Sequence, residues 1–219
     1  MDCIERIVYI NLDHRTDRRE HTEHELNHLG VTNYTRFSAI RTPSPALGCA
    51  LSHYHVVKQA ALDQVSSLLV LEDDFDVLVD KETLNARIQT FMTQCPDYDV
   101  VMFDYNLVTS EPVTEGIARV LEARTATAYL VAGHYLTTLA NCYEEACRAF
   151  TYEPWAHWLY ANDIVWKVLQ PKDKWYCFLP RLMYQHGGYS DLSQRMIEHH
   201  TYASSCSTAS GAQRQGAGT

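Results

Sequence analysis

The chain alternates between short apolar runs and longer stretches in which apolar positions recur with helical spacing. The apolar runs predict buried strands over 6–12, 34–39, 67–71, 99–103, 118–121, 128–131 and 174–179. The helical spacing predicts helices over 17–29, 46–64, 81–95, 135–150 and 162–169. Gly30 follows the first of these helices, where glycine commonly ends a helix in the left-handed conformation.

Strands that alternate with helices predict an α/β fold, a mostly parallel sheet covered by helices. We expect a single domain over residues 1–202 and a low-complexity, disordered tail over 203–219, where large apolar residues are few. Ligands of such sheets bind outside the carboxyl ends of the strands. Two polar motifs, INLDHR and LEDDFD, fall at predicted strand ends.

The apolar content and the net charge of the chain limit the kinds of molecule that it is expected to bind. A chain of 219 residues with 46% apolar residues suits one globular domain, and a net charge of −9 argues against nucleic acid or an anionic membrane as a nonspecific partner. We find neither an N-terminal signal nor an apolar stretch of transmembrane length. The seven cysteines include no C-x-x-C pair, so we expect reduced thiols and a cytoplasmic protein. Peripheral association with a membrane stays open.

The stretch LLVLEDDFDVLV, residues 68–79, carries four carboxylates directly after a predicted strand. Carboxylates in apolar surroundings are ion-paired, solvated or bound to a metal. Hard oxygen ligands suit Mg²⁺ or Mn²⁺. Two registers are open, Glu72 with Asp74 or Asp74 with Asp76, and Asp73 is expected to contact the bound ligand. The alternative is a solvated loop that caps the next helix.

The motif INLDHRTDRRE brings arginines to the carboxyl edge of the first strand. Arg15 and Arg18 could clamp phosphate oxygens, since a guanidinium binds them with two parallel hydrogen bonds. The alternative is a basic helix face paired with neighbouring glutamates, and we favour that interpretation for Arg19.

Two further motifs offer candidate ligands. In GCALSH, Gly48 permits close approach of the backbone near a helix start, and Ser52 and His53 could bind a nucleotide or sugar. In QHGGYSD, His186 could be a further metal ligand on a loop that closes over a ligand. Both motifs also suit purely structural roles, as helix residues and as a turn.

Aromatic residues gather in YEPWAHWLYANDIVW, residues 152–166. Sugars are often held by aromatic faces with a carboxylate nearby, and a general base must reach the acceptor hydroxyl. Asp163 is the candidate base, with Asp191 and Asp104 as rivals. Capping of a helix is the alternative role for Asp163.

In sequence order, three motifs resemble glycosyltransferase family 25, the group of lipopolysaccharide-biosynthesis and collagen galactosyltransferases. VYINLDHRTDRRE is similar to its opening block, GCALSHYHVV to its second and LLVLEDDFDV to its acidic block. The resemblance implies a GT-A fold, a UDP-sugar donor, Mn²⁺ dependence and inversion at the anomeric carbon. Asp76 departs from the pattern because it adds an acid and leaves the metal register open.

The resemblance also implies roles for individual residues. Asn11, Leu12 and Arg15 would line the nucleotide site, and Glu72 with Asp74 would hold the metal. Gly48, Ser52 and His53 match the second block. The segment RTATAY is similar to a donor-side segment of the family, which adds Arg124 and Thr127.

We therefore predict a metal-dependent glycosyltransferase that moves a hexose, galactose or glucose, from a UDP-sugar to an acceptor hydroxyl. The acceptor would be a glycan or a glycosylated protein or lipid. Two other functions stay open: a metal-dependent hydrolase of nucleotide sugars or phosphodiesters, and a non-catalytic binding module with a transferase-like fold.

Overall fold

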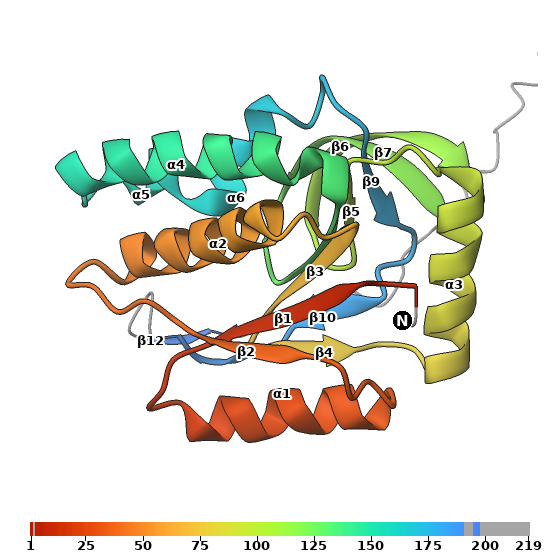
Figure 1. Ribbon diagram of the computed structural model, residues 1–219, viewed down its shortest axis with the longest axis horizontal. Coiled ribbons are helices and arrows are strands. Elements are labelled where there is room, and N and C mark those ends of the chain that lie inside the picture. Colours follow the sequence, from red (N-terminus) through yellow and green to blue (C-terminus); the bar gives the residue numbers. More distant parts are fainter. Residues whose placement is uncertain (2, 191–194, 198–219) are drawn as a thin grey trace, which may run out of the picture.

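A computed structural model describes residue 1, residues 3–190 and residues 195–197. The tail predicted at 203–219 and the predicted domain boundary at residue 202 lie outside the described residues. Helices cover a large central sheet on both of its faces (Figure 1).

The central sheet has eight strands in the order β2-β1-β3-β8-β5-β9-β7-β6. They are β1 (Arg6–Asn11), β2 (Thr35–Ser38), β3 (Ser67–Glu72), β5 (Val100–Met102), β6 (Asn106–Thr114), β7 (Ile117–Arg124), β8 (Ala128–Ala132) and β9 (Trp175–Phe178). Six of these strands run in one direction, and only β7 and β8 oppose them. The prediction of a mostly parallel sheet is confirmed, with β8 inserted antiparallel between β3 and β5.

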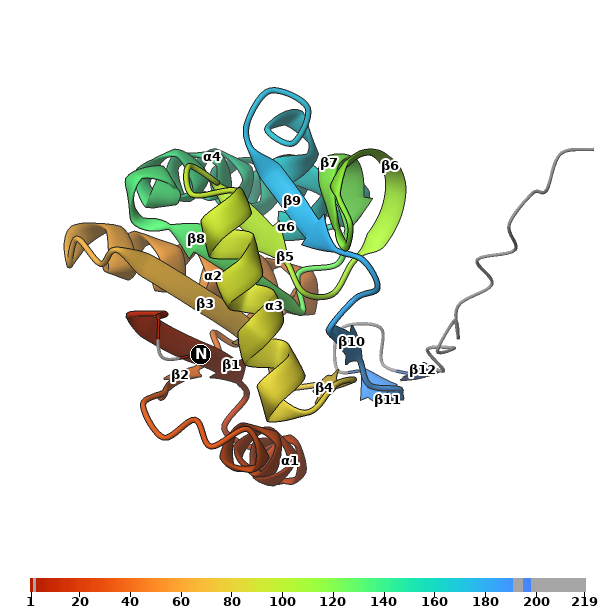
Figure 2. The same ribbon diagram turned by 90° about the vertical axis from the view of Figure 1, so that its right-hand side faces the viewer.

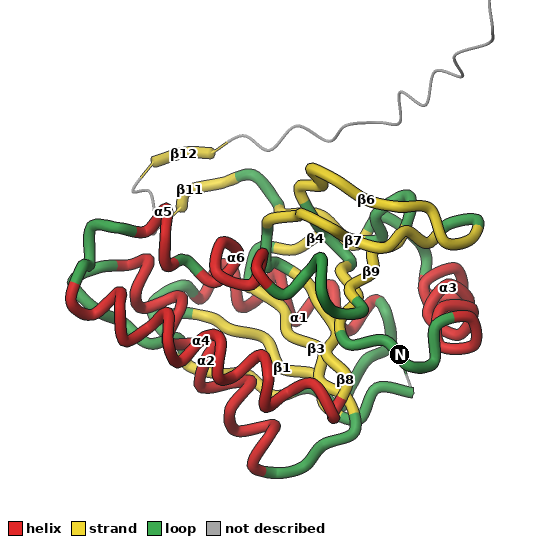
Figure 3. The backbone as a smooth tube through the Cα atoms, turned by 90° about the horizontal axis from the view of Figure 1, so that it is seen from above, coloured by secondary structure: helices red, strands yellow, loops and turns green. Residues whose placement is uncertain are grey.

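Two layers of helices bury the two faces of the sheet. Helices α2 (Pro45–Leu62) and α4 (Leu136–Tyr152) lie side by side on one face, as Figure 3 shows from above. Helices α1 (Thr16–His28) and α3 (Lys81–Gln94) cover the other face, and α3 crosses in front of the sheet in Figure 2. Successive side chains of a strand point to opposite faces, so Val8 and Val70 join the core under α2 and α4, whereas Ile7 and Leu69 join the core under α1 and α3.

Short elements surround the carboxyl edge of the strands. Strand β4 (Phe75–Val77) pairs with β10 (Met183–Gln185), and β11 (Gly188–Ser190) pairs with β12 (Arg195–Ile197). The remaining helical turns are η1 (Gly133–Tyr135), α5 (His157–Tyr160), α6 (Asn162–Val165) and η2 (Trp166–Val168). The helix predicted over 162–169 is therefore two short turns, α6 and η2.

The other predicted strands and helices are present with end shifts of one or two residues, except at 118–121, where β7 is longer. Gly30, at φ 67°, follows the end of α1 as the sequence predicts. The six described cysteines are free thiols. In the described part of the chain, none of the helices combines the length and apolar composition needed to cross a bilayer.

Candidate functional site

The carboxyl ends of β1 and β3 bring together the polar residues that follow them. Asn11, the last residue of β1, donates from Nδ2 to Asp73 Oδ2 at 2.7 Å. Arg18, one turn into α1, donates from one guanidinium nitrogen to Asp73 Oδ1 at 2.8 Å and to Asp74 Oδ2 at 3.1 Å. Because β1 and β3 are parallel neighbours, two residues of the first motif and two of the acidic motif meet at one edge.

Asp74 is a buried carboxylate, and only one of its two oxygens has hydrogen-bond partners among the described residues. Its Oδ2 accepts from Arg18 and, at 3.2 Å, from Gln185 Nε2. Its Oδ1 is buried without a hydrogen-bond partner among the described residues. Burial and the nearby charge of Glu72 raise the pKa of Asp74 to about 7, although Arg18 opposes the shift. A cation beside Oδ1 would relieve this cost.

Asp76 is engaged elsewhere. Its Oδ1 lies 2.8 Å from His21 Nε2, and its Oδ2 lies 2.8 Å from His186 Nδ1. Burial acts to raise the pKa of Asp76, but hydrogen bonds from Tyr184 and His186 outweigh it and lower the pKa. His21 belongs to α1 and His186 follows β10, so this contact fastens the loop after β10 to α1. Both carboxylate oxygens of Asp76 therefore have partners among the described residues.

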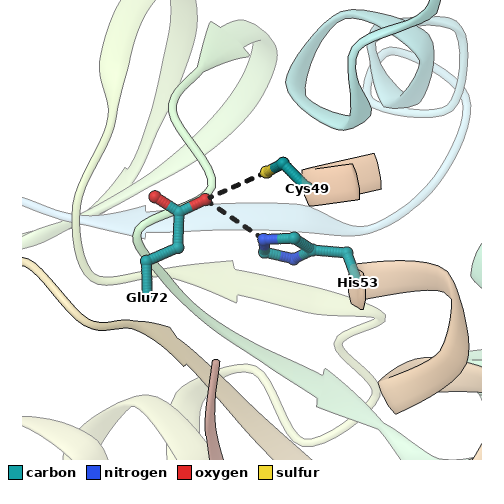
Figure 4. A group of neighbouring side chains, drawn as sticks. All are labelled: Cys49, His53 and Glu72. Carbon is teal, nitrogen blue, oxygen red and sulfur yellow. Dashed lines mark hydrogen bonds and ion pairs between the residues drawn. The ribbon is translucent and has the colours of Figure 1, made fainter. Parts of the chain in front are cut away.

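Glu72 faces helix α2. His53 Nε2 lies 3.1 Å from Glu72 Oε1, and Cys49 Sγ lies 3.9 Å from the same oxygen (Figure 4). His53 is fully buried, and its Nδ1 lies 2.9 Å from the hydroxyl of Tyr129. Burial and then the carboxylates led by Glu72 raise the pKa of the Cys49 thiol. His53 therefore positions the carboxylate that the sequence assigns to a metal.

Asp163 lies on α6, and its Oδ2 accepts from the backbone N–H of Thr125 at 3.2 Å. Thr125 has φ 80°, a conformation that non-glycine residues rarely adopt, and so aims its N–H at this carboxylate. Burial and then the charge of Glu72 raise the pKa of Asp163, and the hydrogen bond from Thr125 and then the charge of exposed Arg124 oppose them. Asp163 and Glu72 are thus electrostatic neighbours, contributed by α6 and β3.

The loop between β7 and β8 supports this edge. Thr127 is fully buried, its carbonyl accepts from the N–H of Glu72 at 2.8 Å, and its Oγ1 has no hydrogen-bond partner among the described residues. The segment 124–127 thus fixes the position of Glu72, while Arg124 itself is exposed.

Gly48 and Ser52 lie at the start of α2, where the chain turns back from β2. A Cβ on Gly48 would overlap the carbonyl oxygen of Ile40. Ser52 is fully buried, and its Oγ accepts from Ile40 N–H at 2.8 Å and donates to the Gly48 carbonyl at 2.7 Å. Both residues fasten α2 to the segment after β2.

A cavity of about 370 Å³ opens beside Asp73 and Asp74. It is lined by Arg15, Asp17, Arg18, His21, Asp73, Asp74, His186, Gly187, Gly188 and Met196. Arg15 is paired with Asp17 at 2.7 Å, and its N–H donates to the carbonyl of Leu12 at 2.9 Å. The cavity is therefore lined by two arginines and three aspartates, and Arg18 contacts Asp73 and Asp74 within it.

The donor set fits a hard divalent cation. Glu72 and Asp74 offer carboxylate oxygens, the ligands that Mg²⁺ and Mn²⁺ prefer. Asp74 Oδ1 is a buried oxygen free of hydrogen bonds within the described chain.

The rivals for the catalytic base differ in their surroundings. Asp104 is buried after β5, where its Oδ1 accepts from Tyr105 N–H at 2.8 Å and from Arg181 at 3.0 Å. Asp191 lies outside the described residues.

Three residues at this edge were not among the predicted ones: Cys49, His21 and Gln185. Cys49 and His53 are four residues apart on a helix and so lie on the same face, a spacing that can be read from the sequence. His21 is three residues after Arg18 on α1, so these two side chains also lie on the same face of their helix. Gln185 could not be found from sequence, because its contact with Asp74 depends on the pairing of β10 with β4.

Comparison with known proteins finds one protein with a similar sequence and a solved structure with the same fold. No protein-family model matches the chain. "Putative glycosyltransferase R655" of Acanthamoeba polyphaga mimivirus is 35% identical over 108 residues, which cover 39% of this chain and 33% of that protein. The matched part thus spans about a third of the length of this relative.

Among solved structures, a glycosyltransferase involved in the glycosylation of the major capsid of PBCV-1 covers 86% of this chain and 95% of its own, with a TM-score of 0.53 and 15% identity. The "mannose-1-phosphate geranyltransferase" of Thermus thermophilus aligns with 82% of this chain and 58% of its own, with a TM-score of 0.46 and 12% identity. The prediction of a single α/β domain with a GT-A-like fold is confirmed by the shared fold of the PBCV-1 enzyme.

Proposed function

We propose that this protein is a glycosyltransferase that moves a hexose from a UDP-sugar to an acceptor hydroxyl with the help of Mn²⁺ or Mg²⁺. The observation that carries the proposal is the buried Oδ1 of Asp74, which has no hydrogen-bond partner in the described part of the chain, on a carboxylate that Arg18 contacts at the carboxyl edge of a GT-A-like sheet. The partial similarity to the mimivirus protein supports the same reaction class. The ordered motifs support assignment to family 25.

In this proposal Glu72 and Asp74 hold the cation. The bound ion would neutralise the negative charge that develops on the departing diphosphate. Asp73 is held by Asn11 and Arg18, at 2.7 and 2.8 Å, so its role is to keep Arg18 and the end of β1 in place.

Arg15 and Arg18, which also line the cavity, would bind the diphosphate. Arg18 already bridges Asp73 and Asp74, and its guanidinium carries further N–H groups that suit phosphate oxygens. The cavity of about 370 Å³ is within the size range of nucleotide-binding pockets.

Asp163 would act as the general base. A carboxylate whose pKa is raised by burial accepts a proton more readily than an exposed one. The N–H of Thr125 orients this carboxylate through a hydrogen bond to Oδ2 at 3.2 Å, and in this proposal the carboxylate accepts the proton of the acceptor hydroxyl. Direct attack by that hydroxyl on the anomeric carbon would invert its configuration.

The acceptor would bind on the aromatic segment that precedes Asp163. Tyr152, Trp155 and Trp158 are 83%, 65% and 58% exposed, which is unusual for side chains with large apolar faces. Such faces stack on the C–H face of a pyranose ring, so a glycan, free or attached to protein or lipid, is the acceptor class.

A donor screen tests the proposal. UDP-, GDP- and CMP-hexoses are added with Mn²⁺, and the melting temperature and the release of free sugar are measured. We expect stabilisation by UDP-sugars with Mn²⁺, because a ligand that binds only the folded state raises its stability, and slow release without an acceptor. Fast, stoichiometric hydrolysis would instead favour a hydrolase, and no stabilisation by any donor at millimolar concentration would contradict donor binding.

A further inference from the structure

The side chains of Cys49, His53 and Glu72 converge beside the carboxyl edge of the sheet (Figure 4). We infer that these three residues form a binding site for one Zn²⁺ ion. This inference goes beyond the proposed function, which gives Cys49 no role: Cys49 and His53 both face Oε1 of Glu72, which would bind Zn²⁺, and the hard cation would take the other oxygen of that carboxylate.

The spacing of the ligand atoms matches what zinc requires. Sγ of Cys49, a ring nitrogen of His53 and a carboxylate oxygen of Glu72 all lie within 4.8 Å of one another. In a tetrahedral zinc site, the usual bond lengths put such ligand atoms about 3.3 to 3.8 Å apart. The 3.1 Å from His53 Nε2 to Glu72 Oε1 and the 3.9 Å from Cys49 Sγ to the same oxygen need only small adjustments.

The histidine is oriented for coordination. The hydroxyl of Tyr129 lies 2.9 Å from His53 Nδ1, and the two rings stack with centroids 5.8 Å apart. The ring of Tyr143 lies edge-on to His53 at 6.5 Å. With Nε2 bound to the ion, Nδ1 would carry the ring proton and donate it to the Tyr129 oxygen. Partners of this kind fix the tautomer and orientation of zinc-bound histidines.

The helix presents two of the ligands together. Cys49 and His53 are four residues apart on α2, so they lie on one face of the helix. Glu72 ends β3 opposite them, and its N–H is held by the carbonyl of Thr127 at 2.8 Å. The three ligands therefore come from two rigid elements rather than from a flexible loop.

The types of ligand atom determine which metal ion this site prefers. A thiolate and an imidazole bind Zn²⁺ far better than Mg²⁺ or Mn²⁺, which prefer oxygen ligands. Binding replaces the thiol proton of Cys49 with the ion and releases that proton to solvent. Three protein ligands leave one position for water, as in zinc sites that are not closed.

Zinc binding is tested on the chelator-treated 219-residue chain without nucleotide, so its result is separate from that of the donor screen. Co²⁺ is the spectroscopic probe, because a Co²⁺–thiolate bond gives a near-ultraviolet charge-transfer band and tetrahedral geometry intensifies the visible bands. Zn²⁺ is then added to displace Co²⁺. We expect one equivalent of Co²⁺ to produce both features and Zn²⁺ to abolish them.

Variants assign the site. Cys49→Ser should remove the charge-transfer band and weaken Zn²⁺ binding about 100-fold or more, whereas Tyr129→Phe, which loses only the orienting hydroxyl, should cost about 10-fold. Cys142→Ser is the matched control, since Cys142 is also a half-buried free thiol, on α4. A full band in Cys49→Ser, or no band in the wild-type protein, would overturn the inference.

A second measurement needs no variant. The metal-free wild-type protein is alkylated with iodoacetamide until Cys49 is labelled, the same treatment is repeated with Zn²⁺, and each cysteine is quantified by peptide mass spectrometry. We expect Zn²⁺ to protect Cys49 and to leave exposed Cys3 equally reactive. Equal labelling of Cys49 under both conditions would refute the site even if the variants failed to fold.

Discussion

Arg18 bridges Asp73 and Asp74 with a single guanidinium nitrogen, at 2.8 and 3.1 Å. The side chain of Arg18 is 18% exposed and those of the two aspartates are 11% exposed. Two adjacent carboxylates that are this deeply buried repel each other, and the positive charge of Arg18 offsets the negative charge of both. The acidic motif is thus partly neutralised by the protein itself, and the Oδ1 atom of Asp74 is left for another positive group.

Removal of Arg18 should therefore destabilise the fold. Arg18→Met leaves two buried carboxylates without their cation, and we expect a loss of about 3 kcal/mol in the free energy of unfolding at neutral pH. Mn²⁺ should restore part of the loss because it can take over the compensation. Urea unfolding with and without Mn²⁺ measures both effects.

Arg19→Met is the matched control for this experiment. Arg19 is the next residue on α1 and pairs with Glu23 on the surface, and exposed pairs of this kind add little stability. Equal unfolding midpoints for the two variants would contradict the compensating role of Arg18.

Gly48 should tolerate no side chain. In Gly48→Ala the new Cβ meets the backbone oxygen of Ile40, which cannot move like a flexible side chain. We expect a loss of about 2 kcal/mol, the usual cost of overpacking. Gly188→Ala provides the comparison, because its Cβ would meet nothing within 4 Å. Thermal unfolding of the two variants measures the loss of stability. An equally small loss in both would show that α2 can shift away from Ile40.

Asp104 should make stability depend on pH. Burial raises the pKa of Asp104 to about 6 from an ordinary 3.8, against the opposing effect of Arg181. The folded state therefore binds this proton more tightly than the unfolded state. Its stabilising contribution is complete below pH 3.8 and is lost as the pH rises through 6.

The Asp104→Asn variant isolates this contribution, since its amide oxygen can still accept from Tyr105 N–H. The free energy of unfolding of the wild-type protein minus that of the variant should fall as the pH rises from 3.8 to 6. Denaturant unfolding across this range gives the difference. A difference that stays constant with pH would mean that Asp104 does not titrate in this window.

Asp163 should affect the reaction and not donor binding. We expect Asp163→Asn to lower the rate of sugar transfer about 100-fold or more, the usual contribution of a general base. The binding of UDP with Mn²⁺ should change little. Steady-state transfer assays and calorimetry separate the two quantities, and Asp80→Asn, at the exposed start of α3, serves as the control. Full transfer activity in Asp163→Asn would assign the base elsewhere.

Periodicity predicted most of the fold because buried strands and helices carry long regular patterns. The sequence did not reveal β6, whose residues 109–112 read TSEP and are largely exposed at the sheet edge. Nor could it reveal the antiparallel insertion of β8, because the order of strands depends on contacts between distant segments. A short apolar run predicts that a strand forms but does not predict which strands lie beside it in the sheet.

The site was predictable to the extent that its motifs end adjacent parallel strands. Asn11 and Asp73 meet for that reason. The partners of Asp76 were not predictable, because His186 reaches it through the β4–β10 pairing. The acidic motif by itself left two metal registers equivalent, and only the three-dimensional contacts show that both carboxylate oxygens of Asp76 have histidine partners.

Calorimetric titration of UDP with and without Mn²⁺ tests the central claim most directly. In the wild-type protein we expect Mn²⁺ to strengthen UDP binding at least about 10-fold, since a metal bridge to the diphosphate contributes more than about 1.4 kcal/mol. Asp74→Asn should abolish this enhancement, whereas Asp76→Asn, which removes a partner of His21 and His186, should keep it. Undiminished enhancement in Asp74→Asn, or none in the wild-type protein, would contradict the account.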